Sequence, residues 1–541
     1  MFQEKTGATL RPFDTSGRFQ PRVGPGETRQ LAVRGAGFTL LSGGLGFGVQ
    51  LVSTVVLARL LTPADFGLVA MVTTFNLLLT NFGLNGFTEA IQQREEINER
   101  LVSNLFWINL GAGALLTVGF AAAGSLLAKL YGDAKVAHVT IALSPTIFLN
   151  SIAVEHLALL KRAMRFSVVS FNDIAARTVS VVVSIALAWA GFGYWALIVG
   201  ALAAPLTVAI GAWVQCRWIP NFPRREPGTG AMVRFAFNIY GRFSFNYFAR
   251  NADNLLVGWR FGSSALGFYK KAYDLFLLSA CQLSAPLTSV AVSALSRLER
   301  HSEQYRRYFL RSLAVMAFVG MGIGADMTLI GKDVILLVLG PGWATAGRIF
   351  KFFGPGVGIM LIYNTHGWLH LSIGTAHRWF RWVVVEFAVT FLLFLVGIHW
   401  GPEGIAGAWT LSFWILTIPA FWYAGKPIGF GVMPVITEVW RFILAALVAG
   451  GASAMILRSV PVFAGVTGPL GALVRMVADS LLFGALYLIA VAVLHGGMAP
   501  LLQFRGLLLD MLPWRKYSRK APAISLPTPE ASDTELVTHP F

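Results

Sequence analysis

Apolar runs of about 20 residues recur along almost the whole chain, and short polar loops separate them. A helix of that length crosses the hydrocarbon layer of a bilayer, because each residue adds about 1.5 Å along the helix axis. The composition agrees, since 55% of the 541 residues are hydrophobic and 13% are charged. The pattern therefore predicts an all-α polytopic membrane protein with about 14 transmembrane helices.

The distribution of Lys and Arg predicts how these helices are oriented. The formal net charge is +17, and most of the 43 Lys and Arg residues fall in both tails and in every second loop. Cytoplasmic loops carry such an excess, so we expect both termini in the cytoplasm. Residues 1–34 have no apolar segment directly after the start, and we expect no cleavable signal peptide. Because the charges lie between apolar runs rather than on a soluble basic face, no nucleic-acid partner is expected.

The loop WIPNFPRREPGTG, from Trp218 to Gly230, is rich in Pro and Gly and divides the chain. We expect two lobes of about six helices each around a central cavity, followed by a C-terminal pair of helices. The predicted boundaries are a cytoplasmic tail at 1–34, the N-terminal lobe at 35–217, the inter-lobe loop at 218–234, the second lobe at 235–424, the helix pair at 425–498 and a partly disordered cytoplasmic tail at 499–541.

Two short segments in the predicted lobes are similar to each other. ARLLTPADFGLVAM (58–71) and WRFGSSALGFYKKA (259–272) each have a basic residue, a short polar turn and a Gly-containing helix start. Either an internal duplication or two unrelated hairpins could give this similarity.

One predicted span, residues 235–259, contains charges that lipid does not accommodate cheaply. Each ionised group near the bilayer centre costs about 2.5 to 3.5 kcal/mol or more, so such groups face a protein interior or a wet cavity. The polar residues of this span recur every three or four positions, which places them on one helical face. They are Arg242, Asn246, Arg250 and Asp253.

The next span adds Lys270, Lys271 and Asp274 to this set. Counting from the turn between the spans places Asp253 beside Lys270 and Arg250 beside Asp274, so two ion pairs could form across the hairpin. The cations of the two spans still outnumber their carboxylates, and a phosphate group would use that surplus. We therefore take the polar residues of both spans as candidate substrate-binding residues. Purely structural ion pairs, and lysines that extend to the membrane interface, are the alternatives.

Carboxylates inside predicted spans could carry a coupling proton or sodium ion. Glu89 and Glu155, in the first lobe, are the candidates for ion coupling. Asp326, Glu386 and Asp479 are weaker candidates, because most of these carboxylates lie near predicted span ends.

Other motifs argue against metal, nucleotide and enzyme chemistry. His366 and His370 are four residues apart, a spacing that could hold a metal ion, but no third ligand stands nearby, so no metal site is predicted. The chain has no GxxxxGK[ST] motif, and we expect no nucleotide or other cofactor. The predicted outer loops are short and offer few catalytic groups, so the chain is not expected to be an enzyme.

Four segments resemble a known family. They are ARLLTPADFGLVAM (58–71), NFGLNGFTEAIQQRE (81–95), NADNLLVGWRFGSSALGFYKKAYDL (251–275) and PLTSVAVSALSRLERHSEQYRRYF (286–309). The chain is similar to the polysaccharide-transporter family of oligosaccharidyl-lipid flippases, the Wzx-type members of the multidrug/oligosaccharidyl-lipid/polysaccharide exporter superfamily.

The resemblance implies a protein of the bacterial inner membrane that works by alternating access. Its substrate would be an undecaprenyl-pyrophosphate-linked oligosaccharide, flipped for O-antigen, capsule or exopolysaccharide synthesis. Its surroundings would include membrane lipid and, as possible partners, a polysaccharide polymerase and assembly proteins. An ion-coupled drug or cation exporter and a lipid II-type flippase share the fold and remain the alternatives.

Overall fold

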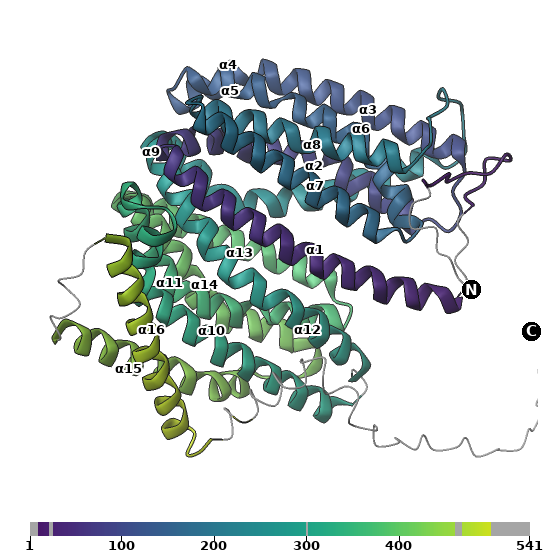
Figure 1. The fold of residues 1–541 in the computed structure, drawn as a ribbon. Helices are drawn as coiled ribbons and strands as arrows, with labels where there is room; N and C mark the ends of the chain where they lie inside the picture. Colours follow the sequence, from purple (N-terminus) through teal and green to yellow (C-terminus); the bar gives the residue numbers. More distant parts are fainter. Residues whose placement is uncertain (1–8, 21–24, 299–300, 460–467, 499–501, 503–541) are drawn as a thin grey trace, which may run out of the picture.

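The computed structural model describes residues 9–20, 25–298, 301–459, 468–498 and 502, and most of them are helical (Figure 1). The helices are α1 (Pro25–Leu60), α2 (Pro63–Gln93), α3 (Glu99–Ala122), α4 (Gly124–Tyr131), α5 (Lys135–Leu143), α6 (Pro145–Arg162), α7 (Phe166–Trp189), α8 (Tyr194–Gln215), α9 (Thr229–Leu298), α10 (Ser302–Val338), α11 (Ala344–Asn364), α12 (His366–Ser372), α13 (Ala376–Gly397), α14 (Gly401–Gly425), α15 (Met433–Ser459) and α16 (Gly468–Leu494).

Within the described residues, 10 segments are long and apolar enough to cross a membrane. One of these segments, His377–Ile428, spans both α13 and α14, whereas α9 and α11 are not among the 10. The charged residues of α9 explain its lower hydropathy. This helix contains Arg242, Asn246, Arg250 and Asp253, the predicted polar face, which we call the polar stripe.

The long element α9 is two helical arms joined at Gly262. This glycine has φ 81° and ψ −176°, a conformation that a residue with a side chain rarely adopts. The chain therefore reverses here, as the predicted turn between two spans requires. The first arm holds Arg250 and Asp253, and the second holds Lys270 and Asp274.

The start of α2 shows how local sequence fixes a helix end. Thr62 is the N-cap residue, and Pro63 follows at the first helical position, where its missing N–H costs nothing. The Thr62 hydroxyl accepts a hydrogen bond from the Asp65 backbone N–H at 3.3 Å, and the Asp65 carboxylate accepts one from the Thr62 N–H at 2.9 Å. This reciprocal cap sets the sharp turn between α1 and α2.

Helices α2 and α9 form the main contact between the two halves of the chain, and the end of α1 adds a bond from Trp343 Nε1 to the carbonyl of Ala58 at 2.8 Å. The hydroxyl of Tyr240 donates to the backbone carbonyl of Leu78 at 3.0 Å, and that of Tyr247 donates to the carbonyl of Thr74 at 2.8 Å. In Figure 1 the elements of the first half lie above those of the second, and α1 runs diagonally between them.

At its closest point this contact is reciprocal. A methyl group added at Gly67 would overlap the backbone carbonyl of Ser263, and one added at Gly267 would overlap the carbonyl of Pro63. Each glycine therefore allows the backbone of the other helix to approach without a side chain between them. The two residues lie in the two segments whose sequences are similar.

The C-terminal pair of helices packs against α10. The guanidinium of Arg475 in α16 lies 2.6 Å from a carboxylate oxygen of Asp333, and the Tyr487 hydroxyl donates to the carbonyl of Phe318 at 2.7 Å. Both α15 and α16 thus attach to the second half, as Figure 1 shows.

The N-terminal region differs from the expected polar tail. Helix α1 begins at Pro25, inside the predicted tail 1–34, although its segment that is apolar enough to cross a membrane is Gly37–Leu60. Residues 9–20 lie against the first half, where the backbone of Leu10 bonds to Gln215 and Arg217 at 2.7 and 2.9 Å. The ring of Phe13 packs against Trp218. This segment packs against the first half because it contains apolar side chains, such as those of Leu10 and Phe13, among its polar residues. Most of the predicted C-terminal tail, 499–541, lies outside the described residues.

Candidate functional site

Asn246 and Arg250 lie on the exposed side of the first arm of α9 and line a cavity of about 120 Å³ among the helices of the second half. Its walls come from α9, α11, α12, α13 and α14. We call it the C-lobe cavity; its polar lining includes Asn246, Arg250, Asn364, His366, Glu386 and Ser412, and its aromatic lining includes Tyr273, Tyr363, Trp379, Phe387, Trp409 and Phe413.

The guanidinium of Arg250 is largely available in this cavity. Its Nε donates to Asn246 Oδ1 at 3.3 Å, and Glu386 of α13 lies within its electrostatic reach. The Tyr363 hydroxyl interacts with the Glu386 carboxylate and accepts a hydrogen bond from Trp382 Nε1 at 2.8 Å. The remaining N–H donors of Arg250 could bind an anionic group that enters the cavity.

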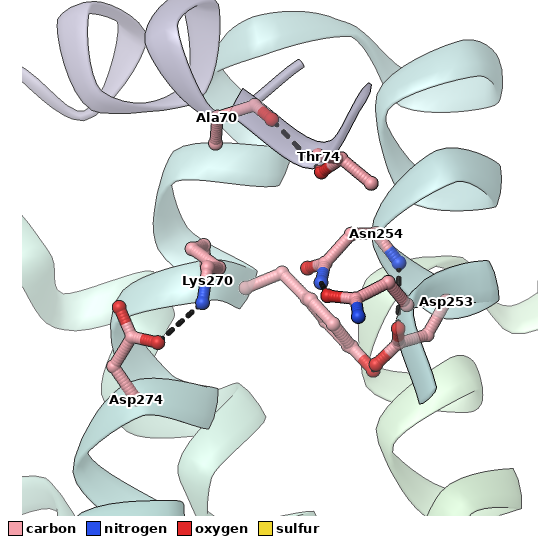
Figure 2. Close-up of polar contacts among 8 residues, drawn as sticks. Ala70, Thr74, Asp253, Asn254, Lys270 and Asp274 are labelled. Atoms are coloured by element: carbon pink, nitrogen blue, oxygen red, sulfur yellow. Dashed lines mark hydrogen bonds and ion pairs between the residues drawn. The ribbon is translucent and has the colours of Figure 1, made fainter. Parts of the chain in front are cut away.

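Asp253 takes a different environment from its neighbours on the stripe. It is 1% exposed, and its carboxylate accepts hydrogen bonds from the Tyr269 hydroxyl and the Asn254 backbone N–H, both at 2.8 Å. Figure 2 shows Asp253 and Asn254 on one arm of α9, with Lys270 on the facing segment directed toward Asp274 rather than toward Asp253. A buried carboxylate is acceptable here because it has two donors.

Lys270 and Asp274 pair with each other, so the two ion pairs that could have formed across the hairpin are not those of the structure. The Nζ of Lys270 lies 2.5 Å from Asp274 Oδ1, one turn along the same arm. The side chain opposite Asp253 is Tyr269, because the turn at Gly262 sets a different register from the one counted along the sequence. Lys271 points to the first half, with its Nζ 4.1 Å from the ring centroid of Phe66 in a cation–π contact.

The remaining predicted residues are separated from one another. The side chain of Arg242 lies outside the described part of the structure. Glu89 is exposed near the end of α2, whereas Glu155 is 0% exposed in α6. The two predicted ion-coupling candidates therefore differ in burial: Glu89 is exposed and Glu155 is buried.

The predicted histidine pair also finds local partners. The Nδ1 of His366 lies 2.6 Å from the carbonyl of Tyr363, and that of His370 lies 3.1 Å from the Thr375 hydroxyl. Within the described residues, no group of three or more His, Cys, Asp or Glu side chains could hold a metal ion.

The interpretation of the sequence underrated Glu386 and omitted the aromatic wall of the C-lobe cavity. Helix α13 meets the first arm of α9 only through tertiary packing, so no spacing along the chain links Glu386 to Arg250. The sequence offered one signal for Glu386: it lies four residues after Trp382, so a carboxylate and an aromatic ring share one face of that helix.

Comparisons with known proteins agree with this architecture. A family model described as polysaccharide biosynthesis protein matches residues 56–347. The succinoglycan biosynthesis transport protein ExoT of Rhizobium meliloti is 24% identical over 368 residues, which cover 68% of this chain and 74% of that protein. The lipopolysaccharide biosynthesis protein WzxC of Escherichia coli is 22% identical over 325 residues, covering 58% of this chain and 64% of that protein.

A solved structure shows the same fold. The lipid II flippase MurJ, in a conformation described as inward closed, matches with a TM-score of 0.69 at 12% identity, covering 87% of this chain and 99% of that chain. The predicted all-α polytopic membrane fold is thereby confirmed. At this identity the match concerns the fold alone.

Proposed function

Because the chain belongs to the polysaccharide biosynthesis protein family, as its motifs predicted, we propose that it flips undecaprenyl-pyrophosphate-linked oligosaccharide units across a bacterial inner membrane. The movement runs from the cytoplasmic to the periplasmic leaflet and supplies O-antigen, capsule or exopolysaccharide synthesis. The family and fold are those of transporters, not of enzymes.

The observation that carries this proposal is the exposed Arg250 in the C-lobe cavity. A pyrophosphate has oxygens that match the paired N–H donors of a guanidinium, and Arg250 has donors left after its bond to Asn246. Aromatic faces such as Trp409 and amides such as Asn364 suit the apolar and hydroxyl faces of a sugar. Arg242 belongs to the proposed site on the strength of its place on the same helical face.

The second arm of α9 supports the site indirectly. The bond from Tyr269 to Asp253 joins the two arms and fixes the register of the hairpin, whereas the pair Lys270–Asp274 lies within the second arm. Lys271 links the hairpin to the first half through Phe66. In the proposed cycle the two lobes rock against each other, the headgroup enters the cavity, and the polyprenyl chain stays in lipid.

The orientation and the partners form part of the same proposal. Both termini face the cytoplasm, because the basic loops lie on that side. A polymerase and assembly proteins that consume the translocated unit are the proposed partners.

The test replaces Arg250 and measures the lipid-linked oligosaccharide that reaches the periplasmic leaflet. Arg250→Ala should lower transport at least tenfold at normal protein level, and Arg250→Lys should recover only part of it, because Lys lacks the paired donors. Arg307→Ala serves as the matched control, since Arg307 is exposed and pairs with Glu303 one turn away.

A double variant separates substrate binding from charge neutralisation. If Arg250 serves only to neutralise Glu386, Arg250→Ala combined with Glu386→Gln should restore transport. Full restoration would refute the phosphate-binding role of Arg250. Efflux of an organic cation by the wild-type protein, without movement of the oligosaccharide, would favour the drug-exporter alternative instead.

A further inference from the structure

The middle of α6 contains a carboxyl group that the C-lobe cavity does not involve. Glu155 is 0% exposed, and so is Asn109, the residue of α3 that faces it. Helix α6 packs against α2, α3 and α8 in the first half. We call Glu155 and Asn109 together the buried carboxyl site.

Two acceptor oxygens of this site have no described hydrogen-bond donor. The Asn109 amide donates from Nδ2 to the carbonyl of Ser151 at 3.1 Å and to Glu155 Oε2 at 3.4 Å. Among the described residues, no donor reaches Glu155 Oε1 or Asn109 Oδ1, although both oxygens are buried. Two neighbouring acceptors without a donor are unfavourable in a protein interior.

No described cation compensates Glu155 if it is ionised. Its neighbour His156 points away, with its ring stacked 4.3 Å from Trp213 and its Nε2 3.1 Å from the carbonyl of Trp218. Helix α8 has no Asp, Glu, Lys, Arg or His. An ionised carboxylate without a compensating cation is strongly disfavoured in such surroundings.

The ionisable groups on the other helices around α6 lie away from the site. Asn109 is about 15 Å along α3 from the first turn, where the charges of that helix lie. On α2, Glu89 is exposed, and Asp65 is bonded in the cap of that helix. The remaining groups, on α3, α5, α7 and the end of α6, are Glu99, Arg100, Lys135, His138, Asp173, Arg177, Lys161 and Arg162; none forms a described bond with Glu155.

We propose that Glu155 is a proton-binding site that gains and loses its proton during transport. A proton on Oε1 removes the charge and turns one of the two unbonded acceptors into a hydrogen-bond donor. A sodium ion fits less well, because it needs several oxygen ligands and, among the described residues, the oxygens of this site without a donor are Glu155 Oε1 and Asn109 Oδ1. The coupling to transport rests on the proposed function, whereas the binding of a proton does not.

The position of the site relative to α2 supports a role in movement. A Cβ at Gly83 of α2 would lie 2.5 Å from Asn109 Oδ1, so the α2 backbone passes directly beside the site. The same helix accepts a hydrogen bond from Tyr240 of α9 at Leu78 and meets Gly267 at Gly67. A change in the orientation of Asn109 therefore acts on the helix that contacts the second half.

The first test follows the proton itself. Infrared difference spectra of the purified protein, recorded across a pH series, should contain a protonated-carboxyl band that shifts in D2O, titrates, and is missing in Glu155→Gln. The variant should fold, because its amide N–H replaces the carboxyl O–H as donor. Glu303→Gln, at an exposed carboxylate, is the control and should keep the band. A band that does not titrate would overturn the exchange of the proton. Loss of the band on adding sodium at constant pH would assign the site to a metal cation instead.

The second test joins the site to transport. In proteoliposomes, wild-type transport should change several-fold between mildly acidic and mildly alkaline buffer, and Glu155→Gln should lose most of that dependence while its protein level stays normal. An unchanged pH profile in Glu155→Gln would overturn the coupling. If the band titrates but no oligosaccharide moves in any variant, the proposed function fails and the proton site remains.

Discussion

At the scale of single residues, Arg162 shows how one side chain completes a helix end. The last carbonyls of α2 and the loop after it converge on its guanidinium: Nη1 donates to Ile91 at 2.7 Å and to Arg94 at 2.6 Å, and Nη2 donates to Glu95 at 2.7 Å. Carbonyls at a helix C-terminus have no partner within the helix and carry partial negative charge, so a cation there is favourable.

We expect Arg162→Ala to lower the free energy of unfolding by about 2 kcal/mol or more, since charged hydrogen bonds are lost and half-buried carbonyls remain. Arg162→Lys should lose less, because an ammonium keeps some of these bonds. Thermal unfolding in detergent measures both. Arg100→Ala, an exposed position at the start of α3, is the control, and an equal loss there would contradict the capping role.

Tyr269 and Asp253 give a second prediction at this scale. Tyr269→Phe removes one of the two described donors to a carboxylate that is 1% exposed, so it should destabilise the protein by about 1 to 3 kcal/mol. Asp253→Asn added to Tyr269→Phe should recover part of the loss, because an amide is cheaper to bury than an unpaired carboxylate. Tyr308→Phe, at a half-buried tyrosine of α10, should have little effect on the same melting curves.

At the scale of elements, the contact between α2 and the second arm of α9 depends on backbone approach. Gly67 and Gly267 leave no room for a side chain, whereas Gly241, on the first arm of α9, faces open space. The three glycines are all helical, so their intrinsic cost in a helix is similar, about 1 kcal/mol relative to Ala.

Gly67→Ala and Gly267→Ala should each force the two helices apart and lower both transport and thermal stability. Gly241→Ala should be neutral or slightly stabilising, since only helix propensity changes there. A cysteine placed at the exposed Ser264 should react faster with a thiol reagent in the Gly67→Ala background than in the wild type. Equal rates would show that the contact tolerates the methyl group.

At the scale of the whole molecule, the length of the apolar runs predicted the fold, because crossing a bilayer requires a fixed helix length. The helical period also placed Asn246 and Arg250 on the same face as Asp253, and the first two line the C-lobe cavity while Asp253 is buried against Tyr269. The side-chain partners of these residues could not be predicted from the sequence. Whether Lys270 meets Asp253 or Asp274 depends on the register at Gly262, and Glu386 reaches Arg250 only through the packing of α13.

The orientation in the membrane can be tested with the same cysteine chemistry. In a variant lacking Cys216 and Cys281, a new cysteine at Ser264 should react with a membrane-impermeant thiol reagent added to spheroplasts, and one at Arg225 should not. Both positions are exposed, so accessibility alone does not distinguish them. Labelling of position 225 from outside would invert the proposed topology.

The reciprocal contact of Gly67 and Gly267 has the form of an interface between identical subunits. Residue i of one surface meets residue j of the other, and j meets i, which is the geometry of a two-fold homodimer. The two halves of this chain meet as two such subunits would, and this favours duplication over two unrelated hairpins. Because each glycine meets backbone rather than a side chain, no second substitution can make room for a first. Trimming a neighbouring side chain would therefore not compensate a substitution at either glycine.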